Sequence, residues 1–386
     1  MKVKNNPETN ILCLALSSEN VEDREKKIEE YWPQIDEDTL FQSAKTDEVA
    51  SHITFLLKQT QLEYCSFWIE EYNDVEQRIT VLMEALEEVA EKLKQQNITI
   101  VALKNAGIAK GIYQNHACSP MGDIDLLVSS KDFHNAHKII LNELGFTFKF
   151  RSELEEENIE EAFRGGGTEY FKEIAGYKVW LELQWRPIAG RWIQPHNEPD
   201  GDELLARSLP IKDSAVRILA PEDNLLQVAL HTAKHSYVRA PGFRLHSDVD
   251  RIVRYQEINW ELFVKKVNEL KVKTAVYFSL YFARELLKTP ITDRVLQQLN
   301  PQWLRKRVIL YYVHKAGIFN QKEKKFSKVG YILFNLALYD SISEIMKAVF
   351  PPFETLKLKY NIHSKWQMPY YHFIRLKDLV LKRTKL

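Results

Sequence analysis

The stretch SPMGDIDLLV (residues 119–128) is the most informative part of this 386-residue chain, since a turn-like SPMG segment leads directly into a strand-like apolar run. Asp123 and Asp125 flank one isoleucine at the start of that run. Side chains alternate along a strand, so the two carboxylates point the same way. Two like charges about 6 Å apart repel by roughly 3 kcal/mol at an effective dielectric near 20. A strand with this pair therefore needs something that offsets the repulsion.

A divalent cation is the usual partner of such a pair, because Mg²⁺ prefers carboxylate oxygens and leaves coordination positions for phosphates. The pattern thus favours a metal site at Asp123 and Asp125. The alternative is a solvated strand end, where Asp123 only caps the preceding turn.

A third carboxylate lies in VWLELQW (residues 179–185), where apolar and polar positions alternate as in a strand and Glu182 lies on the polar face. If this strand pairs beside DIDLLV, three carboxylates converge and can hold two metals that promote displacement at phosphorus. The third acid can also deprotonate the nucleophile. The alternative is an exposed strand residue paired with Arg186 or Lys178, which contributes under about 1 kcal/mol.

The neighbouring segments predict a mixed α/β unit. Apolar residues spaced by three and four between Ile79 and Leu93 predict an amphipathic helix that ends near residues 95–97. A hairpin is expected to turn at Ala175–Gly176, and the acidic and glycine-rich stretch 153–167 reads as a mobile connection. The other expected elements are strands at 98–105 and 146–150, helices at 106–114 and 131–144, and a largely helical chain from Pro221 to the end.

The composition indicates a globular protein and limits which partners and locations we expect. The chain carries 53 basic and 53 acidic residues and is 45% hydrophobic, which is typical of a globular protein and gives no global attraction to nucleic acid. Residues 355–386 hold eight basic residues and one acidic residue, and the aromatic side chains there suit either base stacking or, as we favour, a packed amphipathic helix. Nucleic acid is therefore not expected as a partner. The three dispersed cysteines, the polar N-terminus and the lack of a long apolar run predict a cytoplasmic protein without a membrane span.

Five segments resemble a bacterial nucleotidyltransferase family within the polymerase-β-like superfamily. They are ALKNAGIAKGIYQNHACSPMGDIDLLV (102–128), HKIILNELGF (137–146), VWLELQWRP (179–187), PEDNLLQVALHTAKH (221–235) and RLHSDVDRIV (244–253). The resemblance implies that Asp123 and Asp125 bind Mg²⁺ or Mn²⁺, and that Glu182 completes the acidic triad as a metal ligand or a base.

The resemblance also implies nucleotide-binding residues. Lys104 matches the lysine of a lysine-glycine pair that brings backbone N–H groups to the triphosphate, whereas Asn105 stands where glycine is usual. Asn105 is expected to tolerate the left-handed backbone of that turn. Gly122 and Arg186 are assigned to the same nucleotide site. Two further positions depart from the family pattern: Ser119 replaces an arginine and Gln184 replaces a histidine.

His231 and His235 are four residues apart and share one face of a predicted helix. Asp248 and Asp250 follow, so a His/Asp metal site of the phosphohydrolase type is one interpretation. The interpretation we favour is a polar stripe that lines a groove, or interior histidines that are hydrogen-bonded to Asp248. A third is that His231 and His235 line the cleft opposite the acids and, with Lys234 and Arg239, contact phosphates.

We therefore expect an α+β fold, in which a small mixed sheet forms a nucleotidyltransferase core between N- and C-terminal helical domains. The expected domains are a helical region (1–96), the α/β core (97–187), a helical substrate-cleft region (188–300) and a basic helical region (301–386). The expected activity is Mg²⁺-dependent transfer of a nucleotidyl group from an NTP to an unidentified acceptor, with a ribosomally made peptide or a sugar phosphate as candidates. The alternatives are a catalytically impaired binding module and a transferase of a sugar or phosphate group from another activated donor.

Overall fold

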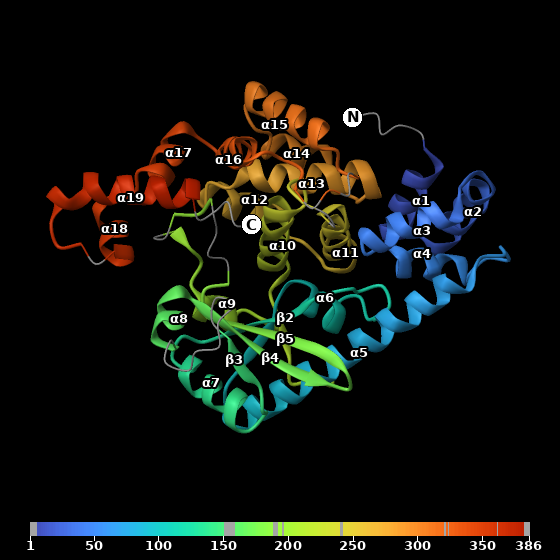
Figure 1. Ribbon diagram of the computed structural model, residues 1–386, viewed down its shortest axis with the longest axis horizontal. Coiled ribbons are helices and arrows are strands. Elements are labelled where there is room, and N and C mark those ends of the chain that lie inside the picture. The colour runs from blue at the N-terminus through green and yellow to red at the C-terminus, as the bar shows by residue number, and fades with distance from the viewer. Residues whose placement is uncertain are drawn as a thin grey trace.

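In the computed structural model, a mixed sheet lies below a helical part in which the N-terminal helices pack against the helices after residue 221 (Figure 1). The N-terminal helices lie to one side of the sheet in this view, and the helices after residue 221 lie above it. The structure describes residues 6–149, 159–187, 192–194, 197–239, 242–319, 322, 324–360 and 362–381.

The N-terminal part consists of four shorter helices and one long helix. Polar side chains cap three of them: Asn6, Asn20 and Asp36 each accept a hydrogen bond from a backbone N–H of the first helical turn. The predicted amphipathic helix ends at Gln95 as expected but begins earlier, at Ser66. The bounds are α1 Pro7–Leu16, α2 Val21–Tyr31, α3 Glu37–Thr46, α4 Ala50–Leu57 and α5 Ser66–Gln95.

The seven-stranded sheet is mixed, which confirms the predicted α+β class. Its strand order is β3-β4-β5-β2-β1-β7-β6. The pairs β2–β5 and β1–β7 are parallel, and the other pairs are antiparallel. The bounds are β1 Ile100–Ala102, β2 Asp123–Val128, β3 Thr147–Lys149, β4 Gly167–Ile174, β5 Tyr177–Gln184, β6 Leu209–Pro210 and β7 Arg217–Ile218.

Four helices lie between or beside these strands: α6 Lys104–Gly111, α7 Phe133–Asn142, α8 Ile159–Gly165 and α9 Gly201–Ala206. The predicted hairpin is confirmed, because β4 and β5 pair around Ala175 and Gly176, both with positive φ as a tight hairpin turn requires. The prediction of a mobile connection at 153–167 is wrong for its second half, where α8 forms and Gly167 begins β4. Residues 150–158 lie outside the described part.

The two faces of the sheet have different partners. Ile124, Leu126 and Val128 pack in a hydrophobic cluster with α5 and α7. Because side chains alternate, Asp123 and Asp125 lie on the opposite face, toward the helices that follow residue 221. The acids therefore lie between the sheet and the C-terminal helices rather than in the core.

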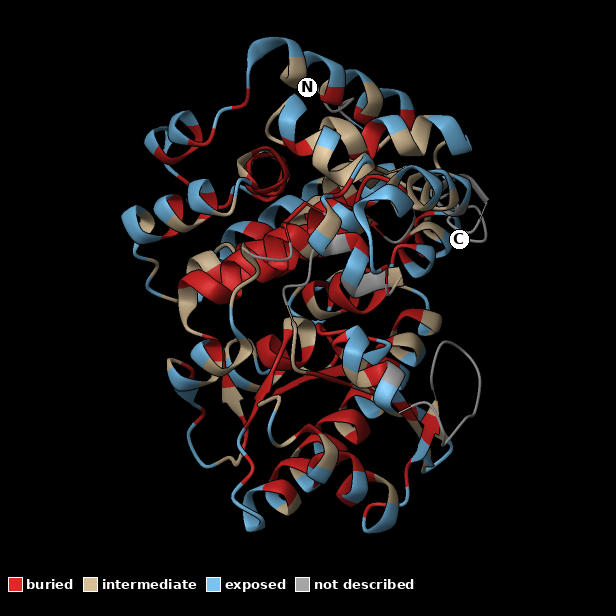
Figure 2. Cartoon of the chain, turned by 90° about the vertical axis from the view of Figure 1, so that its left-hand side faces the viewer, coloured by how far each residue is buried: buried red, intermediate tan, exposed pale blue. Residues whose placement is uncertain are grey.

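The long helix α5 joins two hydrophobic clusters. Trp68, near its N-terminus, packs with α1, α4 and the C-terminal helices. Its later apolar residues, from Val75 to Leu93, pack under the sheet. Figure 2 shows buried residues concentrated in the sheet and in the helices packed on it, with exposed residues around the rim.

The C-terminal part is helical as predicted. It begins with α10 Pro221–His235, the short 3-10 helix Gly242–Leu245 and α11 His246–Tyr255, and α10 and α11 both pack on α13. The remaining bounds are α12 Trp260–Glu269, α13 Lys273–Leu287, α14 Asp293–Gln298, α15 Trp303–Ala316, α16 Lys328–Ala337, α17 Ile342–Val349, α18 Phe353–Tyr360 and α19 Met368–Leu381. Within the described ranges, no helix has the length and apolar character that crossing a membrane requires.

The close packing of α6 on β1 generates a stability prediction. A Cβ added at Gly107 would lie 2.6 Å from the carbonyl oxygen of Ala102, so backbone has to move. We expect Gly107→Ala to lower the free energy of unfolding by about 1–3 kcal/mol in urea denaturation, as overpacking usually does. Gly165→Ala is the matched control, because no atom lies within 4 Å of a Cβ there. Equal effects of the two substitutions would contradict the close contact.

Candidate metal centre

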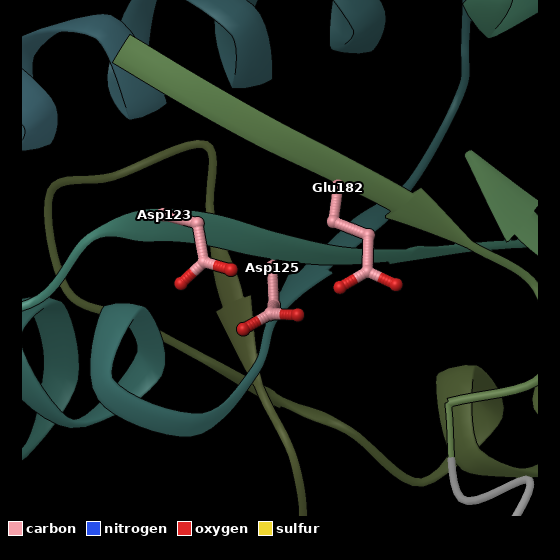
Figure 3. Close-up of side chains that lie close together, drawn as sticks. All are labelled: Asp123, Asp125 and Glu182. Atoms are coloured by element: carbon pink, nitrogen blue, oxygen red, sulfur yellow. The ribbon is translucent and has the colours of Figure 1, made fainter. Parts of the chain in front are cut away.

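Three carboxylates from two neighbouring strands converge on one face of the sheet (Figure 3). The parallel pairing of β2 and β5 places Asp125 directly opposite Glu182, and Asp123 lies two residues earlier on β2. One ligand oxygen from each acid lies within 4.8 Å of the other two. No other such group of three or more His, Cys, Asp or Glu occurs in the part of the chain that the structure describes.

Burial, and then the proximity of another acid, disfavours the charged forms of Asp123 and Glu182. Burial, and then the charge of Asp125, raises the pKa of Glu182 to about 8. The same two causes raise the pKa of Asp123 to about 6. Asp123 is the most exposed of the three acids. An added cation would reverse the effect, because it favours the charged carboxylates.

Lys104 is the cation that faces the acids. Its Nζ lies 2.6 Å from Asp125 Oδ1 and 4.0 Å from Glu182 Oε2. Burial lowers the pKa of Lys104, but Asp125 and Glu182 outweigh it and raise the pKa above its usual value. Gln184 Nε2 also donates to Asp125 Oδ1, at 2.8 Å. Asp125 is therefore the best compensated of the three acids.

The backbone of the turn before α6 differs from the expectation. The left-handed residue is Lys104, with φ +49°, and Asn105 has no positive φ. The prediction that Asn105 adopts the left-handed conformation is therefore wrong, because the strained position is the lysine itself. A lysine in this conformation costs about 1–2 kcal/mol, and its ammonium gains the contact with Asp125.

Asn105 has a supporting role in this geometry. In the amide orientation that satisfies both neighbours, its nitrogen donates to Asp248 Oδ2 at 2.5 Å and its oxygen accepts from Arg244 Nη1 at 3.2 Å. Gly122 is exposed, and a Cβ there would meet no atom within 4 Å. Ser119 is buried, and its hydroxyl donates to the carbonyl of Asn115 within the turn.

The three acids line a cavity of about 360 Å³, and Asn105 and Gly122 also belong to its lining. The sheet provides one wall with Asp123, Asp125 and Glu182. The other wall comes from α10 and the residues after it, and it is rich in cationic and imidazole groups. These are His231, Lys234, His235, Arg239 and Arg244.

A second cavity of about 320 Å³ adjoins the first. The two share Lys104, Glu182, His231 and Lys234 in their linings. The second also has Trp192, Gln227, Leu230 and the glycines 165–167. Glu182 therefore lies where the two cavities meet, whereas Asp123 and Asp125 border the first.

Arg186 lines the second cavity and is paired with the carboxylate of Glu198, which lies outside that lining. Its Nε donates to Glu198 Oε2 at 2.9 Å, and its Nη2 contacts the same oxygen. The alternative in which Glu182 pairs with Arg186 is therefore not what the structure has. Arg186 is placed beside the acids but not in contact with the metal-binding oxygens.

The histidines of α10 do not assemble with the later aspartates. His231 and His235 contact each other, with ring centroids 4.9 Å apart, and burial lowers the pKa of His231 well below its usual value. Asp248 is bound by Asn105. Asp250 is fully buried and accepts hydrogen bonds from Ser18 N, Thr289 Oγ1 and Arg254 Nε. The His/Asp interpretation therefore gains no geometric support, and the two histidines lie in the cavity wall across from the acids.

Sequence reasoning missed two charged residues of the 360 Å³ cavity. Glu48 follows α3, and Arg244 belongs to the 3-10 helix Gly242–Leu245; both line the 360 Å³ cavity. Their Oε2 and Nε atoms are 3.0 Å apart. Glu48 lies in no motif, Arg244 opens the family-like segment 244–253 without a role assigned to it, and 196 positions separate the two, so only the tertiary structure brings them together.

A sequence model of the family described as "Uncharacterised nucleotidyltransferase" matches residues 33–288 of the chain. The match covers α3 through α13, including both acid-bearing strands and the cationic wall. No curated protein and no solved structure matches the chain.

The raised pKa of Glu182 predicts a pH-dependent stability effect. The folded protein holds this proton more tightly than the unfolded chain, whose carboxyl has its usual pKa of 4.5. The stabilisation is complete below pH 4.5 and is lost as pH rises toward 8. Without divalent cations, we expect Glu182→Gln to raise the melting temperature above wild type, and by more at pH 8.5 than at pH 5.

Asp125→Asn is the matched comparison in the same melting experiment. It removes the partner of a buried lysine and of Gln184, so we expect a lower melting temperature at neutral pH. A lower melting temperature for Glu182→Gln at pH 8.5 would contradict the proposed carboxylate repulsion.

Proposed function

The chain belongs to the uncharacterised nucleotidyltransferase family, and on this basis we propose that it transfers a nucleotidyl group from an NTP to an acceptor hydroxyl or phosphate with the help of Mg²⁺. The observation that carries the proposal is the convergence of Asp123, Asp125 and Glu182 on one face of the sheet. This convergence lies within the matched part of the chain.

The donor atoms of the site fit a hard divalent cation. Three carboxylates offer oxygen ligands within 4.8 Å of one another, and oxygen is the ligand that Mg²⁺ and Mn²⁺ prefer. A sulfur or imidazole ligand is absent from this described cluster. When bound, the ion would offset the charge of the acids and the charge that develops on the phosphate oxygens.

In the proposed reaction, an acceptor oxygen attacks the α-phosphorus of the NTP. The new bond is between that oxygen and phosphorus, the bond from phosphorus to the oxygen bridging to the β-phosphate breaks, and pyrophosphate leaves. Glu182 accepts the proton that an acceptor hydroxyl loses. Lys104 and the cationic residues of α10, together with Gly122 and Asn105 in the same lining, surround the phosphates.

The two adjoining cavities suit two substrates. The 360 Å³ cavity has the acids and most of the cationic groups, so we assign it to the triphosphate of the donor. The 320 Å³ cavity has Trp192, Leu230 and Gln227 in its walls, and its Arg186 is neutralised by Glu198, so we assign it to the acceptor. Glu182 lies at their junction, which is where a base for the acceptor has to be.

Calorimetry tests whether the acids form a metal–nucleotide site. We expect wild type to bind a non-hydrolysable NTP analogue only when Mg²⁺ is present, and Asp123→Asn to weaken this binding at least tenfold, as loss of a metal ligand does. The control is Asp293→Asn, which neutralises an exposed aspartate on α14 outside the cavity. Binding by wild type that is unaffected by Mg²⁺ or by Asp123→Asn would count against the proposal.

The leaving group distinguishes this reaction from the alternatives. Nucleotidyl transfer releases pyrophosphate, whereas phosphoryl transfer to an acceptor leaves a nucleoside diphosphate. We expect pyrophosphate as the product when the protein is incubated with Mg²⁺, NTPs and low-molecular-weight cell extract, and no release by Glu182→Gln. Nucleoside diphosphate as the main product would favour a phosphate-transferring enzyme, and tight NTP binding without any product would favour a binding module.

A further inference from the structure

Arg244 is a buried arginine in the wall of the proposed donor cavity. Only 6% of the residue is exposed, yet it is part of the lining shared with Asp123, Asp125 and Glu182. Its Nη1 donates to Asn105, which fixes one edge of the guanidinium. An arginine held in this way presents a planar set of donors, a geometry that matches phosphate oxygens.

The carboxylate next to Arg244 is an imperfect partner. Glu48 Oε2 lies 3.0 Å from Arg244 Nε, but Nε is buried and makes no hydrogen bond, so the contact has poor geometry. The Glu48 side chain is 42% exposed, whereas that of Arg244 is 7% exposed. A partner that remains hydrated on one side and is poorly aligned holds the arginine weakly.

The backbone of Glu48 is strained. It has φ +57° and follows Asp47, the C-cap of α3, at the position where helices often end with a glycine. Val49 N donates to Ala44 O at 2.7 Å, which closes the end of the helix around this residue. A glutamate here is less favourable than glycine, so the local fold does not explain the side chain, whose carboxylate lies beside Arg244 in the cavity lining.

We propose that Arg244 binds the polyphosphate chain of the substrate, and that Glu48 is a temporary counter-ion which the phosphates displace. This inference rests on the proposed function, since it assigns a phosphate ligand to the donor cavity. The ligand class is a linear polyphosphate rather than a single anion, because Lys234, His235 and Arg239 line the same wall and one small anion cannot contact them all.

The displacement has a direct consequence for affinity. A phosphate that reaches Arg244 has to compete with the Glu48 carboxylate and is also repelled by it. Removing the charge of Glu48 therefore strengthens polyphosphate binding, while removing the guanidinium weakens it. A gain of affinity is informative, because a misfolded variant cannot produce it.

The experiment is calorimetric titration of the full-length protein with two probes: inorganic tripolyphosphate, and an Mg²⁺-bound non-hydrolysable NTP analogue. We expect Glu48→Gln to bind both probes about three- to tenfold more tightly than wild type. We expect Arg244→Met to bind both at least tenfold more weakly, since a charge-assisted hydrogen bond contributes about that much. Melting curves report whether Arg244→Met is folded.

A second carboxylate provides the matched control. Glu71→Gln removes the same charge from α5, where Glu71 pairs with Lys45 at 2.7 Å outside the donor cavity. We expect wild-type affinity for both probes. A gain equal to that of Glu48→Gln would mean that net charge alone is responsible, and it would overturn the inference.

The outcomes separate this inference from the proposed function. If the NTP analogue binds in a manner that requires Mg²⁺ and Asp123, but Glu48→Gln and Arg244→Met have wild-type affinity, the inference is wrong and the proposed function stands. If both variants change tripolyphosphate affinity as expected, while Mg²⁺ and Asp123 make no difference to the NTP analogue, the proposed function fails and the polyphosphate site stands. If wild type and Glu48→Gln bind neither probe, both are wrong.

Discussion

The ion pair between Lys104 and Asp125 is the contact on which the rest of the site depends. Parallel pairing of β2 with β5 places Asp125 opposite Glu182, and this arrangement concentrates negative charge on one face of the sheet. The ammonium of Lys104, at the left-handed start of α6, lies against that charge with a distance of 2.6 Å to Asp125. The strand register thus brings the acids together, and the strained residue Lys104 supplies the positive charge that offsets them.

Local sequence patterns were sufficient to predict the two strands that carry the acids and the hairpin. The alternation in DIDLLV and VWLELQW identifies both strands and the face of each acid, and the register in the structure agrees with the convergence those patterns suggested. The strands β6 and β7 have two residues each, too few for any alternation to be visible. The left-handed residue at the start of α6 was assigned to Asn105 on intrinsic preference, whereas the tertiary contact with Asp125 favours Lys104.

Contacts between distant segments account for what the sequence did not reveal. Asp248 and Asp250 follow His235 closely in sequence. In the structure, however, Asp250 accepts hydrogen bonds from Ser18 and Thr289, and Asp248 accepts one from Asn105. Glu48 lies between α3 and α4, and it lines the cavity because the N-terminal part of the chain folds against the C-terminal helices. The N-terminal helices are thus part of the site's construction and not only a neighbouring unit, which no spacing rule within residues 97–187 conveys.

The packing of the long helix α5 limits where the chain can gain or lose residues. Its 30 residues span about 45 Å, and its two halves pack in separate hydrophobic clusters, with Trp68 in one and Val75 in the other. Inserting one residue between these two positions would rotate one half by about 100° against the other and move both apolar stripes away from their clusters. A one-residue insertion is therefore expected to be tolerated in the loops of this chain far better than between these two positions of α5.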